Sequence, residues 1–153
     1  LSGAIRAATL VDSAGDIYIG TKDNEDSKLY KIDGTCPTSP VIWEIDTNAD
    51  VYTTGVILDT GIIVIGTEPD FDAGILKAYS TTATTGTLEG FFDLDADMTW
   101  GSLRMHKGRL IGVANVATPI LGGFMFSIDT AGARYERGAQ NPTFRGNNLS
   151  TGR

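Results

Sequence analysis

Short runs in which apolar and polar residues alternate recur along the whole chain, and turn signals separate them. DIYIGT (16–21) is followed by a charged stretch and then by KLYKID (28–33). Alternation over four to eight positions, rich in Ile, Val, Thr and aromatic residues, predicts β-strands. Gly-containing turns such as Thr60–Gly61 and Lys107–Gly108 divide one run from the next. The pattern therefore predicts an all-β fold with no helix of three turns between residues 5 and 138.

The same unit occurs three times, because Gly20, Gly66 and Gly112 lie in similar runs at intervals of 46 residues. The expected strands are 7–12, 16–21, 28–33 and 41–46, then 53–58, 62–67, 75–80 and 88–95, then 100–105, 109–114, 124–129 and, more weakly, 133–138. Four antiparallel strands in about 46 residues correspond to one β-propeller blade. We predict three four-stranded antiparallel blades at about 5–46, 47–95 and 96–138, and a segment 139–153 that is a polar tail or the start of a further blade.

The distribution of side-chain size agrees with this arrangement. The first run of each unit contains small residues, as expected for strands that crowd toward a common axis, and the second runs are rich in Ile and Val, as expected between neighbouring blades. Trp43 and Phe92 fall in the outer fourth strands, where we expect them to cover the edge of the interface between blades. Glycine has no packing benefit within a strand, so the repeated Gly20, Gly66 and Gly112 predict a close approach of the neighbouring blade or a bulge.

The motifs GDIYIGT, KLYKID and VIWEID resemble the quinoprotein-alcohol-dehydrogenase-like (PQQ-like) β-propeller repeat. In the first unit the resemblance rests on Gly15, Ile17, Tyr18, Gly20, Thr21, Leu29, Tyr30, Asp33 and Trp43. Phe92 and Tyr135 stand at or near the Trp position of the later units, and Ser80 replaces the Asp of the second. The resemblance covers about residues 5–138 and implies a propeller. It implies no single function, because the repeat occurs in enzymes and in non-enzymatic scaffolds.

Three blades do not close a ring, because propellers have about four to eight. The chain is therefore expected to be a fragment of a longer propeller or to assemble with other copies. We favour the fragment, because the chain begins and finishes within the pattern and does not open on Met. Both end blades should expose apolar faces, so residues 1–153 alone are expected to associate and to pack against further blades from the same chain or another copy.

Composition and charge narrow the range of partners. The net charge is −7, which argues against a nucleic-acid partner, and no stretch has the roughly 18 apolar residues of a membrane span. The single cysteine, Cys36, excludes an internal disulfide and is read as a loop thiol, with an intermolecular or reactive thiol as the alternative. A composition weighted to Thr, Gly, Ala and Asp is common in extracellular, surface and virion β proteins.

The acidic loop between the second and third strands of the first unit is the candidate metal site. The oxygen atoms of Asp23, Asn24 and Asp26 could hold calcium. The loop lacks the glycine and the Glu spacing of an EF-hand, and the alternative is an ordinary acidic hairpin tip. The corresponding loop of the second unit, 68–72, is also acidic, whereas that of the third, 115–119, contains no acid.

Other candidate residues carry little chemistry. His106 is the only histidine and is expected to be a solvated turn residue, because a catalytic base or ligand would need partners that the sequence does not supply. Asn148–Leu149–Ser150 matches the acceptor pattern for N-glycosylation.

These observations favour a non-catalytic binding or structural module that presents loops to a protein or glycan partner, and no catalytic residue is assigned. One alternative is a fragment of a PQQ-dependent quinoprotein dehydrogenase, for which the resemblance implies a quinone on the axis of a larger ring, with calcium. None of its ligands can be placed and the family's adjacent-cysteine pair is absent, so no PQQ is expected. The other alternative is a virion or cell-surface structural protein.

Overall fold

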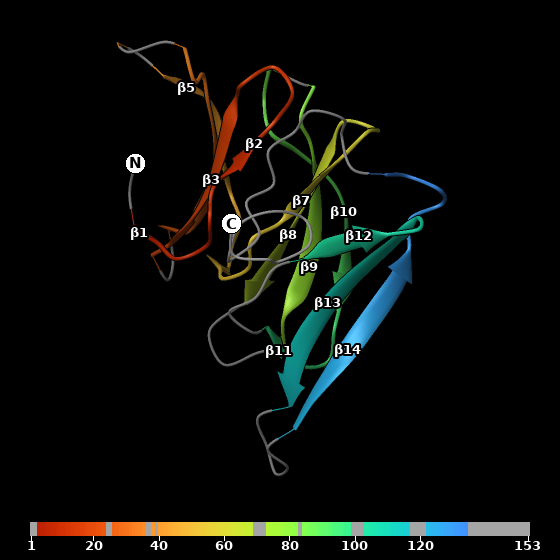
Figure 1. Ribbon diagram of the computed structural model, residues 1–153. Coiled ribbons are helices and arrows are strands. Elements are labelled where there is room, and N and C mark those ends of the chain that lie inside the picture. The colour runs from red at the N-terminus through yellow and green to blue at the C-terminus, as the bar shows by residue number, and fades with distance from the viewer. Residues whose placement is uncertain are drawn as a thin grey trace, which may run out of the picture.

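The computed structural model describes residues 3–134, except 24–25, 36–37, 39, 69–72, 83, 99–102 and 117–121. Within these ranges the chain is all-β and contains no helix. Figure 1 shows three antiparallel sheets side by side, none of which closes on itself. The predictions of an all-β fold and of three successive antiparallel sheets are confirmed.

Each sheet uses consecutive strands. The first contains β1 (Ala4–Ile5), β2 (Leu10–Val11), β3 (Ile17–Lys22), β4 (Lys28–Ile32) and β5 (Val41–Asp46). The second contains β6 (Asp50–Val51), β7 (Val56–Leu58), β8 (Ile62–Glu68), β9 (Ile75–Ser80) and β10 (Thr87–Asp93). The third contains β11 (Asp97–Met98), β12 (Arg104–His106), β13 (Arg109–Val116) and β14 (Gly122–Asp129). Most of its expected fourth strand, 135–138, lies outside the described residues.

The first strand of every unit differs from the prediction, because it is broken into two short pieces that both pair with the second strand. In the second sheet the break lies between β6 and β7. There the Thr53 hydroxyl accepts a hydrogen bond from the backbone N–H of Gly66 at 2.8 Å, replacing a bond between main chains. Thr54 instead bonds to both neighbouring sheets: its hydroxyl accepts from Ala8 N at 3.0 Å and its carbonyl from Leu103 N at 2.9 Å.

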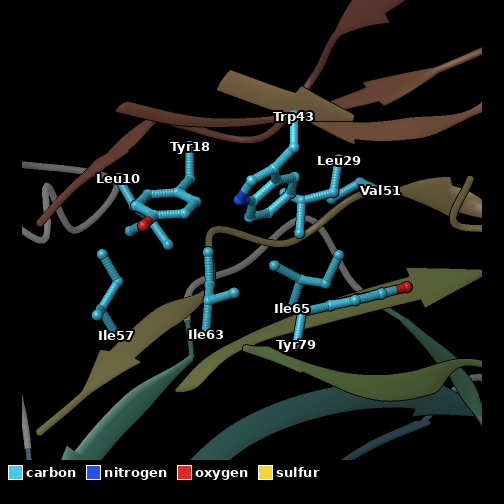
Figure 2. Packing of buried hydrophobic residues seen from close by; sticks show 9 residues of the cluster. All are labelled: Leu10, Tyr18, Leu29, Trp43, Val51, Ile57, Ile63, Ile65 and Tyr79. Carbon is cyan, nitrogen blue, oxygen red and sulfur yellow. The ribbon is translucent and has the colours of Figure 1, made fainter. Parts of the chain in front are cut away.

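The middle sheet is covered by apolar side chains on both faces. Ile63 and Ile65 of β8 pack with residues of the first sheet, as Figure 2 shows, whereas Ile62 and Val64 pack with the third. Successive residues of a strand point to opposite faces, so a strand between two sheets is apolar at every position. We expected the second strand of every unit to be rich in Ile and Val because it lies between neighbouring blades, and β8 confirms that such a strand packs on both faces.

The two outer-strand aromatics behave differently. Trp43 on β5 is 5% exposed, with its ring centroid 6.0 Å from that of Tyr18, so it covers the interface as predicted. A Cβ atom on Gly86, just before β10, would lie 3.1 Å from Trp43 Cε3, which shows that the next sheet covers the indole. Phe92 on β10 is 52% exposed, and the same prediction is wrong for it. Among the described residues, the third sheet has no fourth strand to lie over this ring.

The glycines do not share one role. A Cβ atom on Gly20 would lie 2.3 Å from Val51 Cγ1 of the second sheet, which confirms a close approach of a neighbouring sheet at this position. A Cβ atom on Gly112 would meet Phe126 Cζ at 2.3 Å, within its own sheet. Gly66 lies two residues after Val64, on the face of β8 toward the third sheet, whereas Gly112 lies two residues after Leu110, on the face of β13 toward the second sheet. The prediction that the three glycines repeat one role is therefore wrong for Gly112.

Candidate functional site

A polar cluster joins the first two sheets next to the acidic loop. We call Lys22, Ser27, Asp50 and Tyr52 the Asp50 cluster. The Asp50 side chain is 2% exposed and forms an ion pair with Lys22 Nζ. Ser27 Oγ donates to Asp50 Oδ1 at 2.6 Å, and Lys22 Nζ donates to the Tyr52 hydroxyl oxygen at 2.7 Å. The two sheets are thus joined through a buried carboxylate whose two oxygens both accept hydrogen bonds.

The electrostatics of the cluster follow from these contacts. The hydrogen bond to Asp50 raises the pKa of Lys22 above its usual range, and the bond to the Tyr52 hydroxyl adds to this effect. Lys22 Nζ also lies 5.0 Å from the centroid of the Tyr52 ring, on its face. A lysine held in its charged form beside a buried carboxylate stabilises an interface and is unsuited to act as a base.

The candidate calcium residues lie directly beside this cluster. Asp23 and Asp26 are exposed, and Asn24 lies outside the described residues. Local hydrogen bonds hold the loop ends together: Asp26 N donates to the Asp23 carbonyl at 3.0 Å, and Asp23 N donates to Ser27 Oγ at 2.8 Å. In the part of the chain that the structure describes, no group of three metal-ligating side chains gathers. Calcium at Asp23, Asn24 and Asp26 stays a prediction.

A second polar cluster lies at the opposite end of the same interface. Asp12 Oδ1 accepts from Asp16 N at 2.9 Å, and Asp12 Oδ2 accepts from the Tyr18 hydroxyl at 2.9 Å. Lys31 Nζ lies 2.9 Å from Asp16 Oδ2 and donates to the Thr81 carbonyl of the second sheet at 3.0 Å. The pKa of Tyr18 is raised far above its usual value, mainly because the side chain is buried and secondly because its hydroxyl is bonded to Asp12. Like the Asp50 cluster, these groups bind one another and hold two sheets together.

The turns at one end of the three sheets come together to form a composite surface, which we call the hairpin end. It comprises the described parts of segments 12–16, 33–40, 59–61, 81–86, 107–108 and 130–134. Asp59 N donates to the Arg134 carbonyl at 2.8 Å, and Arg134 N donates to Asp59 Oδ1 at 2.9 Å, so the turns of the second and third sheets are tied together.

An open hollow lies in the hairpin end at the third sheet. Among the described residues it is lined by Met105, Lys107, Gly108, Gly132 and Arg134. Lys107 and Arg134 are exposed, and both lie in a chain whose net charge is −7. Two cations beside an accessible hollow provide a local attraction for anionic groups that the chain as a whole repels.

The other residues singled out in the sequence lie outside both polar clusters. His106 is exposed at the last position of β12, which confirms that it is a solvated residue at a hairpin. Glu68 ends β8, and the rest of 68–72 lies outside the described residues, as do Cys36 and Asn148.

Sequence reasoning missed both polar clusters. Lys22 and Asp50 are 28 residues apart, and Lys31 and Thr81 are 50 apart. One signal was available: Asp50 precedes Val51 at the start of an apolar segment, where a carboxylate requires a partner if it is buried.

Comparisons with known proteins assign no family. No protein-family model matches the chain, and no curated protein has significant sequence similarity to it. In the ranges that the structure describes, no helix has the length and hydropathy required to cross a bilayer.

Proposed function

We propose that the chain is a non-catalytic binding module, built as three successive blades of a β-propeller, which presents its hairpin end to a protein or glycan partner. The hollow between Lys107 and Arg134 is the observation that carries the binding role. The alternating pattern, the three consecutive sheets and the buried contacts between them support the scaffold.

The propeller arrangement is supported where the first strands meet. Blades of a propeller are arranged around an axis with their first strands innermost. Thr54, in the broken first strand of the second sheet, bonds to Ala8 in the first unit and to Leu103 in the third. The side chain of Val51 on β6 also lies against Gly20 on β3 of the preceding sheet.

The buried charged groups support a structural role for the sheets. Asp12 and Asp50 are 9% and 2% exposed, and their carboxylates accept hydrogen bonds from Tyr18 and Ser27 respectively. A general base or nucleophile must reach substrate, and these oxygens are engaged inside the interface.

The hairpin end has the properties of a recognition surface. Turns on a rigid β scaffold carry binding residues in many folds, because they can vary without disturbing the core. Lys107 and Arg134 favour a partner that carries carboxylate, sulfate or phosphate groups, through hydrogen bonds strengthened by charge. We therefore propose an acidic glycan or an acidic segment of a protein as the ligand.

The proposal is tested by measuring binding of the full chain to arrays of neutral, sialylated and sulfated glycans and of acidic and basic peptides. Acidic probes should bind and be recovered unchanged, and Lys107→Glu should weaken binding about tenfold or more. Lys28→Glu makes the same charge change on β4, away from the hollow, and should leave binding unchanged. Equal losses in both variants, or no binding of any acidic probe, would refute the proposal. The proposal would also be refuted if the chain bound PQQ stoichiometrically in the presence of calcium, seen as a bound chromophore, and then oxidised alcohols.

A further inference from the structure

One cross-strand pair recurs in all three sheets but is exposed only in the third. Gly20 pairs with Leu29 in the first sheet, and Gly66 pairs with Leu76 in the second. Both leucines are buried, at 1% and 3% exposed, beneath the sheet that follows. The corresponding pair in the third sheet is Val113 and Met125, which are 47% and 73% exposed.

This third pair does not have the shape that receives a further sheet of the same kind. Gly20 leaves room for the side chain of Val51, which approaches so closely that even a Cβ atom on Gly20 would lie 2.3 Å from it. In the third sheet Val113 occupies the position of that glycine, so the notch is filled. A fourth sheet could not bring its first strand as close as Val51 comes to Gly20, and the surface favours a flatter partner.

We infer that this face of the third sheet is a self-association surface that binds the same face of a second copy. We call it the β13–β14 face; it includes Arg104, His106, Arg109, Ile111, Val113, Met125, Ser127 and Asp129. The contact is between like faces because Val113 fills the notch that a first-strand side chain of another copy would need. On the outward side of the first sheet, that side chain is Ile5, which pairs with Thr21 as Val51 pairs with Thr67 and is 51% exposed.

The face is complementary to itself in both shape and charge. A two-fold axis parallel to the strands, between β13 and β14, places β13 of one copy over β14 of the other. Val113 then lies over Met125 of the second copy, and Arg109 over Asp129 of the second copy. Within one chain Arg109 and Asp129 are 3.8 Å apart, with side chains 48% and 72% exposed. Such an exposed pair contributes little by itself and can engage a second copy at low cost.

The size of the face predicts a weak dimer. β13 and β14 are eight residues long. At about 3.3 Å per residue and about 4.8 Å between strands, the two strands that overlap cover roughly 250 Å² on each copy. Stable interfaces bury about 800 Å² per partner, so we expect a transient dimer with a dissociation constant on the order of 100 µM.

Sedimentation equilibrium of the full chain from about 10 µM to about 1 mM tests the inference. The wild type should pass from monomer to dimer, and Met125→Lys should weaken dimerisation by about tenfold or more. Phe91→Lys is the matched control, because Phe91 is 68% exposed on β10, outside this face, and its replacement should have no effect. Val113→Thr is a second, milder variant for the case that Met125→Lys does not fold. It is nearly isosteric, lies on the surface and should weaken the dimer several-fold.

The charge arrangement has its own test. Arg109→Asp places a carboxylate opposite the Asp129 carboxylate of the second copy and should weaken the dimer, whereas the double exchange R109D/D129R should restore it. A wild type that stays monomeric at about 1 mM, higher oligomers that continue to grow, or a dimer unaffected by both Met125→Lys and Val113→Thr would overturn the inference. A monomer would leave the proposed ligand binding untouched, because the hollow with Lys107 and Arg134 lies at the hairpin end.

Discussion

Replacing Gly20 with alanine probes the packing between the first two sheets. The new Cβ atom would lie 2.3 Å from Val51 Cγ1 and 2.6 Å from Val51 Cβ. These distances are far below van der Waals contact, and Val51 is 1% exposed on a short strand between two sheets. The valine cannot turn away into solvent, so the two sheets must move apart or the strand must shift.

The magnitude follows from two opposing effects. Overpacking a well-filled interior costs about 1–3 kcal/mol. Restricting the unfolded chain by changing glycine to alanine stabilises by about 0.4–1 kcal/mol. We therefore expect Gly20→Ala to lower the free energy of unfolding by about 1–2 kcal/mol.

Denaturant unfolding of the full chain, with a double-mutant cycle, measures this effect. Val51→Ala alone should cost about 2 kcal/mol for lost burial and the cavity it leaves. Because the smaller side chain makes room for the new Cβ, the double variant should be about 1–2 kcal/mol more stable than the sum of the single changes predicts. Gly90→Ala is the control, since its Cβ would meet nothing within 4 Å, and it should be neutral or slightly stabilising. Additive effects in the cycle, or equal losses for Gly20→Ala and Gly90→Ala, would refute the close approach.

Two further predictions concern charge. Asp50→Asn should lower the free energy of unfolding by about 2–4 kcal/mol, because it leaves Lys22 without its buried counter-ion. Glu44→Gln is the control: Glu44 is 48% exposed and pairs with Lys28 at 2.7 Å, and its neutralisation should cost less than about 1 kcal/mol. Equal losses of the two variants in denaturant melts would contradict the distinction. Burial raises the pKa of Tyr79 to about 12 from 10.0, so its contribution is complete below pH 10 and is lost as the pH rises to about 12. The stability should therefore fall by about 2–3 kcal/mol more in the wild type than in Tyr79→Phe over this interval, and parallel pH profiles would contradict the assignment.

The strands themselves could be predicted from the sequence with good accuracy. Alternation in 28–33, 41–46 and 75–80 corresponds to β4, β5 and β9 within one residue at either end. These strands pair with neighbours close in the chain, through hairpins whose turn residues are visible in the sequence. Local pattern is sufficient where both the pairing and the turn are local.

At the candidate site, the sequence predicted the position of the acidic loop but not the contacts beside it. Its place between the second and third strands was predictable, and Asp23 and Asp26 lie there. The buried carboxylate beside it was not, because Asp50 meets Lys22 only when the second sheet packs on the first. Likewise, the cations Lys107 and Arg134 belong to separate turns that meet only at the hairpin end.

The sequence by itself determined the all-β class, the threefold repetition and the apolar second strands, because each of these depends on periodicity along a short segment. Tertiary structure decided the broken first strands, where Thr53 and Thr54 bond across the chain, and the direction in which Gly112 faces. It also decided that Trp43 is buried and Phe92 exposed, although both are aromatic residues of outer strands. The physical reason is common to all of these: burial and hydrogen bonding of a strand's side chains depend on the sheet packed against it, and that sheet comes from residues tens of positions away.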